Sequence, residues 1–493
     1  MASTPTSISN EPNEVPIASL SETDRRIAVR GDEVDWEGSN DPKNPMNWSE
    51  KRRLISVILI SIVGFLTPFS SSVSAPATAQ IMNEFHTSDK TLEGFVVSVF
   101  VLGNAVGPLL FGPASEVWGR SIILNSCNAL FVAFTIGCAL ATSLPMLMVF
   151  RFLSGCVGAA PVAIGGGVIA DLIPKERRGK AMGIFTTGSL AGPVVGPIAG
   201  GYLAQGINWR WSFWLVVIIG GLVSVLVLLV LRETHAPTVL KWKASKIQKH
   251  NGGPMLRVPG IKDEPLSKVC TQAIVRPAKM LFLSPITASL SVFQALVFGY
   301  MYLMFTTFTP TFETKYGFSL GESGVVYLSL GVGIAITAFT VTQYSDKLML
   351  ARGAKKNREG RPEDRLLLMS YGAPMVPIGL LWYGWSAQHQ LHFMVPIVGI
   401  AFVGLGIMSV SLPGNLYMVD TFTNYAASAL AAVTFLRSVA GGLIPLAGPP
   451  MFNALDVGWG CSTLAFIAVA LCPIPLLLTR YGELIRTKFP VRL

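Results

Sequence analysis

Two arginines interrupt long apolar stretches of this 493-residue chain, and they are the side chains there with the most capacity for chemistry. Arg437 lies near the middle of its stretch, where "RSVAGG" lets a neighbouring helix approach closely. Arg151 lies about two turns from the end of its stretch, from which a long side chain also reaches the surface. A guanidinium is costly in apolar surroundings unless it is paired. We therefore expect Arg437 to line a cavity or to pair with a carbonyl or an acid.

The acids lie at the ends of the apolar stretches rather than deep inside them. They include Glu93, Asp171, Glu313, Glu322 and Asp420. Glu116 and Asp346 occupy matching positions, each followed by basic residues. A carboxylate at such an end interacts with helix N-termini and arginines in one arrangement of a two-state protein and not in the other. The absence of buried carboxylates argues against a multivalent cation, such as a polyamine, as substrate.

Patterns that indicate enzymes or metal sites are missing from the sequence. There is no Ser/His/Asp, HExxH or phosphate-loop pattern, and "GVGIAI" at 331–336 has no preceding strand. The six cysteines have no metal-ligand spacing, and five of them lie in apolar stretches. We expect no enzyme activity, no metal site and no cofactor.

The elements that must position these residues are apolar helices. Hydrophobic residues make up 51% of the chain, charged residues 13%, and the mean hydropathy is +0.53, whereas soluble domains carry about a quarter charged residues. A spanning helix needs about 20 apolar residues. Twelve stretches meet this length, which predicts an all-α membrane protein: 54–79, 93–112, 122–142, 146–170, 181–204, 211–231, 283–310, 322–343, 366–386, 392–416, 425–449 and 459–479.

Lysine and arginine are concentrated in alternate loops, and this asymmetry sets the expected orientation. It places both termini and the central loop in the cytoplasm, so the net charge of +10 reports topology and no nucleic-acid partner is expected. The polar, acidic N-terminal tail is expected to be disordered. The predicted parts are a tail at 1–53, six-helix bundles at 54–231 and 283–480, a central cytoplasmic loop at 232–282 and a C-terminal tail at 481–493.

The stretch "GSLAGPVVGPIAGG", residues 188–201, combines a glycine stripe with two prolines. Gly188, Gly192, Gly196 and Gly200 recur every fourth residue and share one face of a helix. Small residues let membrane helices approach closely, and Pro193 and Pro197 bend or stiffen the helix beside the stripe. We expect a helix of the other half to pack on this stripe and close the outer gate. "GGLIPLAGPP" at 441–450 repeats the pattern six helices later.

These segments resemble the drug:proton antiporters of the major facilitator superfamily, in particular their fungal twelve-span branch. "GSLAGPVVGPIAGG" is similar to their antiporter motif, "GPASEVWGRS" to the loop signature after span 2, and "RFLSGCVGAAP" to the span 4 motif. Two positions differ: Glu116 replaces the usual Asp, and Ser121 replaces a second basic residue. The resemblance implies the major facilitator fold, twelve helices in two six-helix halves. The expected gating and coupling residues are Gly112, Glu116, Gly119, Arg120, Arg151, Asp171, Gly188, Gly192, Pro193, Gly196, Pro197 and Arg437.

The resemblance also implies that spans 1, 4, 7 and 10 line the substrate cavity. These spans offer aromatic and amide side chains, together with the serines at 70–72, which suit an amphipathic organic molecule with a few hydrogen-bonding groups. The expected substrate-binding residues are Phe65, Phe69, Gln294, Tyr300, Tyr302, Phe305, Met408 and Asn415.

The favoured function is a secondary exporter of drugs, toxins or secondary metabolites, working by proton antiport and alternating access. The expected partners are an organic substrate, protons and the lipid bilayer, and the protein is expected to be a monomer in the plasma membrane, with the vacuolar membrane as the alternative. A proton symporter or facilitator for uptake of a small nutrient is the second hypothesis, although "RETHAP" at 232–237 stands where a sugar porter would carry a PESPR-type sequence. A membrane enzyme or receptor is the third.

Overall fold

The structure is a computed structural model that describes residues 29–30, 33–36, 38, 41–174, 177–251, 258, 266–355 and 361–489. Most of the N-terminal tail expected to be disordered lies outside these residues, as do Lys175, Lys356 and Arg358 of the basic loops. Two short strands, β1 (Val29–Arg30) and β2 (Glu33–Val34), pair in antiparallel fashion ahead of the helices.

The first half of the chain forms six long helical segments. The first crossing begins with α2 (Glu50–Ser72) and continues through η3 (Ala75–Ala77) and α3 (Thr78–Glu84). The next five follow with short connections: α4 (Lys90–Trp118), α5 (Arg120–Ala139), α6 (Leu144–Leu172), α7 (Arg178–Gly206) and α8 (Arg210–Val230).

The second half repeats this arrangement. Its helices are α11 (Pro285–Tyr316), α12 (Leu320–Lys355), α13 (Leu366–Gly372), α14 (Met375–Gln388), α15 (Met394–Thr421), α16 (Ala426–Leu471) and α17 (Pro473–Lys488). Within the described residues, eleven segments are long and apolar enough to cross a membrane, and the last runs for 63 residues. That segment turns back at Asp456, which has a φ of 56° inside α16, so it holds two crossings. The predicted twelve helices in two six-helix halves are confirmed.

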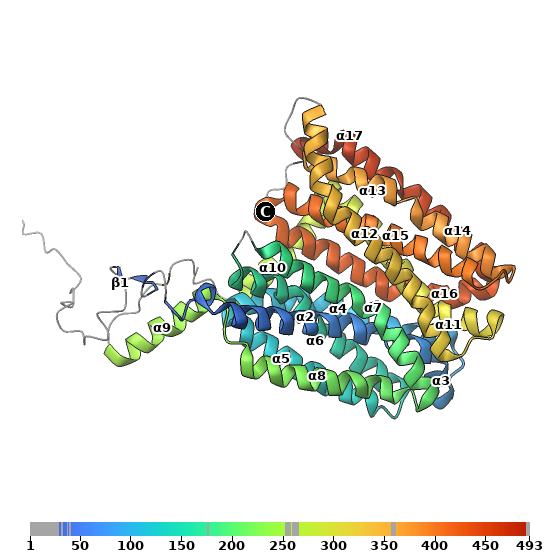
Figure 1. The fold of residues 1–493 in the computed structure, drawn as a ribbon, viewed down its shortest axis with the longest axis horizontal. Helices are drawn as coiled ribbons and strands as arrows, with labels where there is room; N and C mark the ends of the chain where they lie inside the picture. Colours follow the sequence, from blue (N-terminus) through green and yellow to red (C-terminus); the bar gives the residue numbers. More distant parts are fainter. Residues whose placement is uncertain are drawn as a thin grey trace, which may run out of the picture.

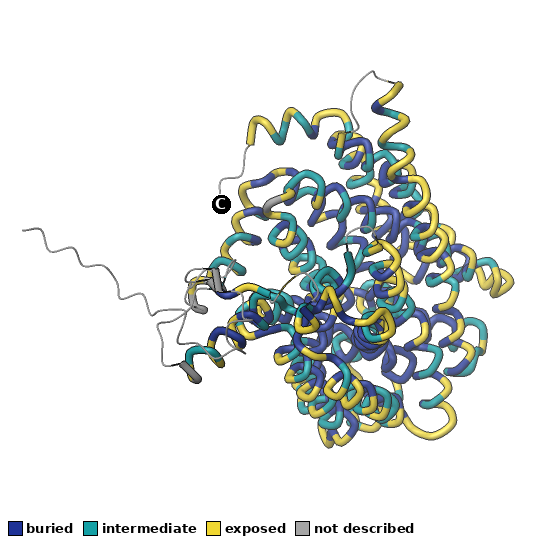
Figure 2. The backbone as a smooth tube through the Cα atoms, turned by 60° about the vertical axis from the view of Figure 1, so that its left-hand side comes forward, coloured by how far each residue is buried: buried dark blue, intermediate teal, exposed yellow. Residues whose placement is uncertain are grey.

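The helices lie side by side in one bundle whose two ends differ (Figure 1). We call the end with Glu50 and Lys488 the base, and the end with Glu84 and Tyr316 the top. The outer surface carries many exposed apolar side chains, such as Leu229 and Phe339, which are 73% and 66% exposed. Buried backbone fills the interior (Figure 2). A surface of this kind is suited to lipid.

The glycine stripe of α7 packs on α2 of its own half, so the expected contact with the other half is wrong. A Cβ built on Gly192 would lie 2.7 Å from the backbone nitrogen of Phe69, and one on Gly188 would lie 3.1 Å from the carbonyl oxygen of Ser61. Gly196 and Gly200 approach α2 in the same way, at Ser72 and Val73. A four-residue period defines a helix face, and it does not say which neighbour covers that face.

The halves meet on the adjacent face of α7 and along α4, toward the top. A Cβ on Gly324 of α12 would lie 2.5 Å from the carbonyl oxygen of Pro197 on α7. One on Gly94 of α4 would lie 3.2 Å from the carbonyl oxygen of Pro445 on α16. Pro197 of α7 and Pro445 of "GGLIPLAGPP" therefore take part in backbone contacts between the halves.

The segment between the halves contains two helices that the sequence analysis treated as loop. In α9 (Ala236–Asn251), Leu240 and Ala244 are spaced by four residues and pack with Val34 of β2. The amphipathic α10 (Leu266–Leu283) lies against both α4 and α16 at the base. Charged residues between the apolar positions concealed both helices from a search for continuous apolar stretches.

Candidate functional site

Arg151 is fully enclosed in the first half and holds the ends of two helices together. Its guanidinium donates to four carbonyl oxygens at 2.9–3.2 Å: those of Ser70, Ser71, Val96 and Val97. The residue is 1% exposed, and its guanidinium also lies over the ring of Phe100, 5.2 Å from the centroid. Because α2 ends at Ser72, the carbonyls of its last turn lack intrahelical donors. Arg151 supplies those donors, so snorkelling to the surface is excluded for this arginine.

The Arg151 cluster connects to the second half through one pair of hydroxyls. The hydroxyl oxygens of Ser71 on α2 and Tyr302 on α11 are 2.9 Å apart and buried. Tyr302 lies near the middle of α11, so this contact joins the two halves well inside the bundle. The backbone carbonyl of Ser71 binds Arg151 while its side chain meets Tyr302.

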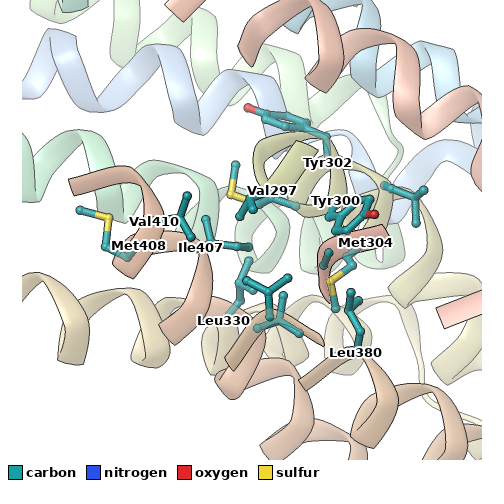
Figure 3. Packing of buried hydrophobic residues seen from close by; sticks show 14 of the residues in the cluster. Val297, Tyr300, Tyr302, Met304, Leu330, Leu380, Ile407, Met408 and Val410 are labelled. Carbon is teal, nitrogen blue, oxygen red and sulfur yellow. The ribbon is translucent and has the colours of Figure 1, made fainter. Parts of the chain in front are cut away.

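Tyr300 and Tyr302 point in different directions, although both were expected to line the cavity. The Tyr300 hydroxyl donates to the carbonyl oxygen of Leu464, 2.9 Å away within its own half. Figure 3 shows Tyr300 among core residues of the second half, whereas the ring of Tyr302 is turned away from them. Of the two, only Tyr302 faces the first half.

Arg437 lies on α16 with its guanidinium over the ring of Phe298, 4.7 Å from the centroid. Its Nε is buried and has no hydrogen-bond partner in the described part of the chain. One turn further along α16, Gly441 approaches two side chains: Phe298 of α11, in the same half, and Val101 of α4, in the first half. Arg437 therefore lies where α11, α16 and α4 come together. The expected carbonyl or acid partner is not among the described residues.

The remaining expected substrate-binding residues divide between the two halves. Phe65 and Phe69 form a pair on α2 with ring centroids 5.3 Å apart. Phe305 lies against Tyr302 on α11, with centroids also 5.3 Å apart. The other three belong to α11 and α15: Gln294 is fully buried beside Gly414, Asn415 is partly buried next to that glycine, and Met408 is 7% exposed in the core of the second half.

At the base of the first half, Arg120 forms an ion pair with Asp171. Its Nε donates to a carboxylate oxygen of Asp171 at 2.6 Å, and its guanidinium covers Gly167. The backbone amides of Arg120 and Ser121 donate to the carboxylate of Glu233 at 2.9 and 3.0 Å. Glu233 is 6% exposed and caps the N-terminus of α5, a favourable position for an anion. It belongs to "RETHAP", and the sequence analysis missed its role.

Two glycines of the loop signature have different surroundings. Gly119 has a φ of +105°, and a Cβ there would lie 2.5 Å from the carboxylate of Glu233. This position therefore requires glycine. A Cβ on Gly112 would meet no atom within 4 Å. Glu116, on the same helix, is exposed, and the described residues offer it no partner.

The second half has a matching arginine group at its base. The sequence analysis named the two acids of this group but not its arginine. Arg365 donates to Asp420 and to Asp346, each at 2.6 Å, and to the hydroxyl of Ser345 at 2.9 Å. Ser345 and Asp346 end the membrane-spanning part of α12, as Ser115 and Glu116 end α4. Each group lies entirely within its own half.

The arrangement of two six-helix halves meeting at buried polar contacts is that of a multi-pass membrane transporter. The family model of the Major Facilitator Superfamily matches residues 60–445. The chain belongs to this superfamily, and the predicted family is confirmed.

Named relatives are fungal transporters. The chain is 45% identical over 460 residues to the MFS-type transporter penM of Penicillium rubens, covering 93% of this chain and 90% of that protein. It is 44% identical over 463 residues to the efflux pump radE of Floropilus chiversii, covering 93% and 86%. Among solved structures, the xylose transporter XylE of E. coli, described as partially occluded and inward open, matches with a TM-score of 0.66 at 17% identity, covering 88% of this chain and 98% of that one.

Proposed function

We propose that this transporter exports hydrophobic or amphipathic organic compounds by alternating access, driven by proton antiport. The observation that carries the proposal is the contact between Ser71 and Tyr302 inside the bundle. It couples the Arg151 cluster of one half to an aromatic row on the other. A ligand entering there would contact both halves at once, so its binding would change their relative arrangement.

The chemistry of the surrounding side chains supports an organic substrate. Phe298, Tyr302 and Phe305 follow one another along α11 with centroids 5.2–5.3 Å apart. Aromatic rings with a few polar groups suit flat, amphipathic molecules. One similar protein is named an efflux pump, which favours export over uptake.

The distribution of contacts supports a two-state cycle. In this arrangement the halves approach each other closely toward the top, at Gly324 and Gly94. At the base, the Arg120 and Arg365 groups pair within their own halves. We assign the base, with the basic loops and both termini, to the cytoplasm, and the membrane to the plasma membrane. This conformation then faces the cytoplasm, from which an exporter loads. The protein acts as a monomer.

A transport assay in yeast lacking its own drug pumps tests the proposal. Cells expressing the chain should accumulate less fluorescein and tolerate more cycloheximide and cerulenin than cells expressing Glu116→Gln at equal surface abundance. Addition of a protonophore should raise accumulation to the level of the variant.

Two results would contradict the proposal. Higher accumulation of several compounds in expressing cells would indicate uptake. Lower accumulation that persists after the proton gradient is collapsed would separate export from proton antiport.

A further inference from the structure

The two arginines inside the bundle differ in how completely they are satisfied: Arg151 is 1% exposed, and Arg437 is partly exposed with a buried Nε. Arg151 has four carbonyl acceptors within 3.2 Å. Arg437 has a single ring beneath it, a buried Nε without a partner, and no hydrogen bond or ion pair to its guanidinium within the described residues. A charge in apolar surroundings is stable only when it is paired or hydrogen-bonded. Arg437 therefore has unused capacity for a ligand that accepts hydrogen bonds.

Other unsatisfied polar groups lie around the same junction. The Oδ1 of Asn104 on α4 is buried without a partner, one turn toward the base from Val101, which Gly441 approaches. Both polar atoms of the Gln294 amide are also buried without partners, but this amide lies beside Gly414 of α15, inside the second half. Asn104 of α4 and Arg437 of α16 thus each have an unsatisfied polar atom near the point where the two halves meet. Unpaired buried polar atoms are uncommon and call for an explanation.

The net charge of this region is positive. The Tyr302 hydroxyl lies within electrostatic range of both Arg151 and Arg437, and it binds Ser71 rather than an acid. The nearest acids in the sequence of α11 and α16, Glu313 and Asp456, lie toward the top ends of their crossings. The interior of the bundle thus presents two cations and no neutralising carboxylate among the described residues near them.

We propose that Arg437 is the anion-binding group of the substrate site, and that the preferred substrates are amphipathic aromatic compounds carrying a carboxylate or a similarly acidic hydroxyl. The acidic group would accept hydrogen bonds from the guanidinium of Arg437. The aromatic body would lie along Phe298 and Tyr302, whose centroids are 5.2 Å apart. This assignment rests on the proposed transport function and narrows its substrate class.

The ligand chemistry follows from the geometry of arginine. Its planar guanidinium matches a carboxylate with two parallel hydrogen bonds, which a lysine ammonium does not reproduce. An uncharged alcohol or amide forms a weaker contact with a cation than an anion does. The site should therefore discriminate by charge between molecules that share one aromatic body.

The test compares 1-pyrenebutyrate with 1-pyrenebutanol on the purified full-length protein in lipid nanodiscs, with binding followed by fluorescence anisotropy at pH 7.5. The wild-type protein should bind the acid about tenfold more tightly than the alcohol, the difference expected of a charge-assisted hydrogen bond. Arg437→Gln should bind both probes equally. Arg437→Lys should keep part of the preference, and Arg437→Glu should instead prefer 1-pyrenemethylammonium.

The matched control is Arg480→Gln, which removes one positive charge from the same half at the edge of a cavity of about 470 Å³ near the base. It should leave the preference unchanged. The proposal is overturned if the wild-type protein shows no preference for the acid, including the case in which neither probe binds, or if Arg437→Gln retains it. Equal elution volumes of all variants on gel filtration exclude misfolding, and Arg437→Lys keeps the test valid if the glutamine variant is unstable.

The yeast assay separates this inference from the function on which it rests. If Arg437→Gln exports both neutral and acidic compounds at the wild-type rate, the protein is an exporter but Arg437 is not its anion-binding group. Arginine-dependent binding of the acid in a protein that exports nothing would retain the site and remove the exporter.

Discussion

The base of each half holds an arginine group, and the two groups share a plan but differ in their acids. In the second half, Arg365 binds two carboxylates, Asp420 and Asp346. In the first half, Asp171 is the one carboxylate among the described residues that the Arg120 side chain binds, and Glu116, at the position that matches Asp346, is exposed and has no partner there. The buried Glu233 instead binds the backbone at the start of α5. In the second half, both acids of the group therefore bind the arginine. In the first half, one of the two acids, Glu116, is unpaired among the described residues.

For the proposed transport cycle, we infer from this difference that the first half carries the part of the gate that moves. An unpaired carboxylate gains a partner only when the halves rearrange, and a differential contact of this kind is what shifts a two-state equilibrium. Gly112, one turn before Glu116, has free space around its Cα in this conformation. Both residues are then expected to make their contacts in the other conformation.

The largest effect is expected from removing the single acid of the first group. Asp171→Asn leaves the largely buried Arg120 without a counter-ion, whereas Asp420→Asn leaves Arg365 its bond to Asp346. Asp171→Asn should lower stability by about 1–3 kcal/mol and nearly abolish efflux, with a smaller loss for Asp420→Asn. Thermal unfolding and efflux are measured together. Equal losses for the two variants would show that the groups are equivalent.

The next effect separates transport from stability. Glu116→Gln should reduce efflux by about tenfold, a typical coupling energy for a switch, with an unchanged Tm, since no contact in this conformation is lost. Asp346→Asn breaks an ion pair whose acid is 72% exposed, so it should cost less than about 1 kcal/mol. Normal efflux by Glu116→Gln at equal surface expression would show that Glu116 is a solvated residue without a role in transport.

A smaller effect is expected from the turn at Gly119 in the first group. Gly119→Ala forces a side chain into the left-handed region and toward Glu233, at a cost of about 1–3 kcal/mol. Efflux should fall only in proportion to the amount of folded protein. Gly179→Ala is the control, because a Cβ there meets nothing within 4 Å. A change in efflux per folded molecule would give the turn a role beyond structure.

The smallest effect concerns pH. Burial lowers the pKa of His235, the positive charge of Arg120 lowers it further, and Glu233 opposes both. Because the folded protein then binds a proton less readily than the unfolded chain, stability is complete above about pH 6.5 and declines as the pH falls below it. The Tm of the purified protein should drop slightly between pH 7.5 and 5.5, and the drop should be smaller in His235→Asn. An identical drop in both would assign the effect to other groups.

The sequence predicts the helices of this protein better than their neighbours. Apolar stretches of sufficient length located all twelve crossings, because hydrocarbon allows few alternatives to a helix. The glycine stripe of α7 was correctly predicted to seat a helix, but its partner is α2, at Phe69 and Ser61. Periodicity fixes a face, and only the packing of the whole bundle decides what covers it.

The candidate site was only partly predictable for a different reason. Arg151 was recognised because a charge in an apolar stretch is rare, but its partners are backbone carbonyls, which any residue supplies. Glu233 and Arg365 lie just outside apolar stretches. Charged residues are common there, so their presence alone does not indicate a functional site. The different directions of Tyr300 and Tyr302 were available from the sequence, since residues two apart on a helix point to nearly opposite sides.

The close contacts of Gly324 and Gly94 at the top give the molecule the mechanics of a lever. The 36-residue α12 is about 54 Å long at 1.5 Å per residue. Gly324 lies one turn from its upper end, so a rotation of about 10° there would move the lower end by roughly 8 Å. Backbone packed on backbone has little side-chain bulk to resist such a tilt. In the proposed transport cycle, a small rotation about this contact at the top would be converted by the length of the helices into a large displacement at the base.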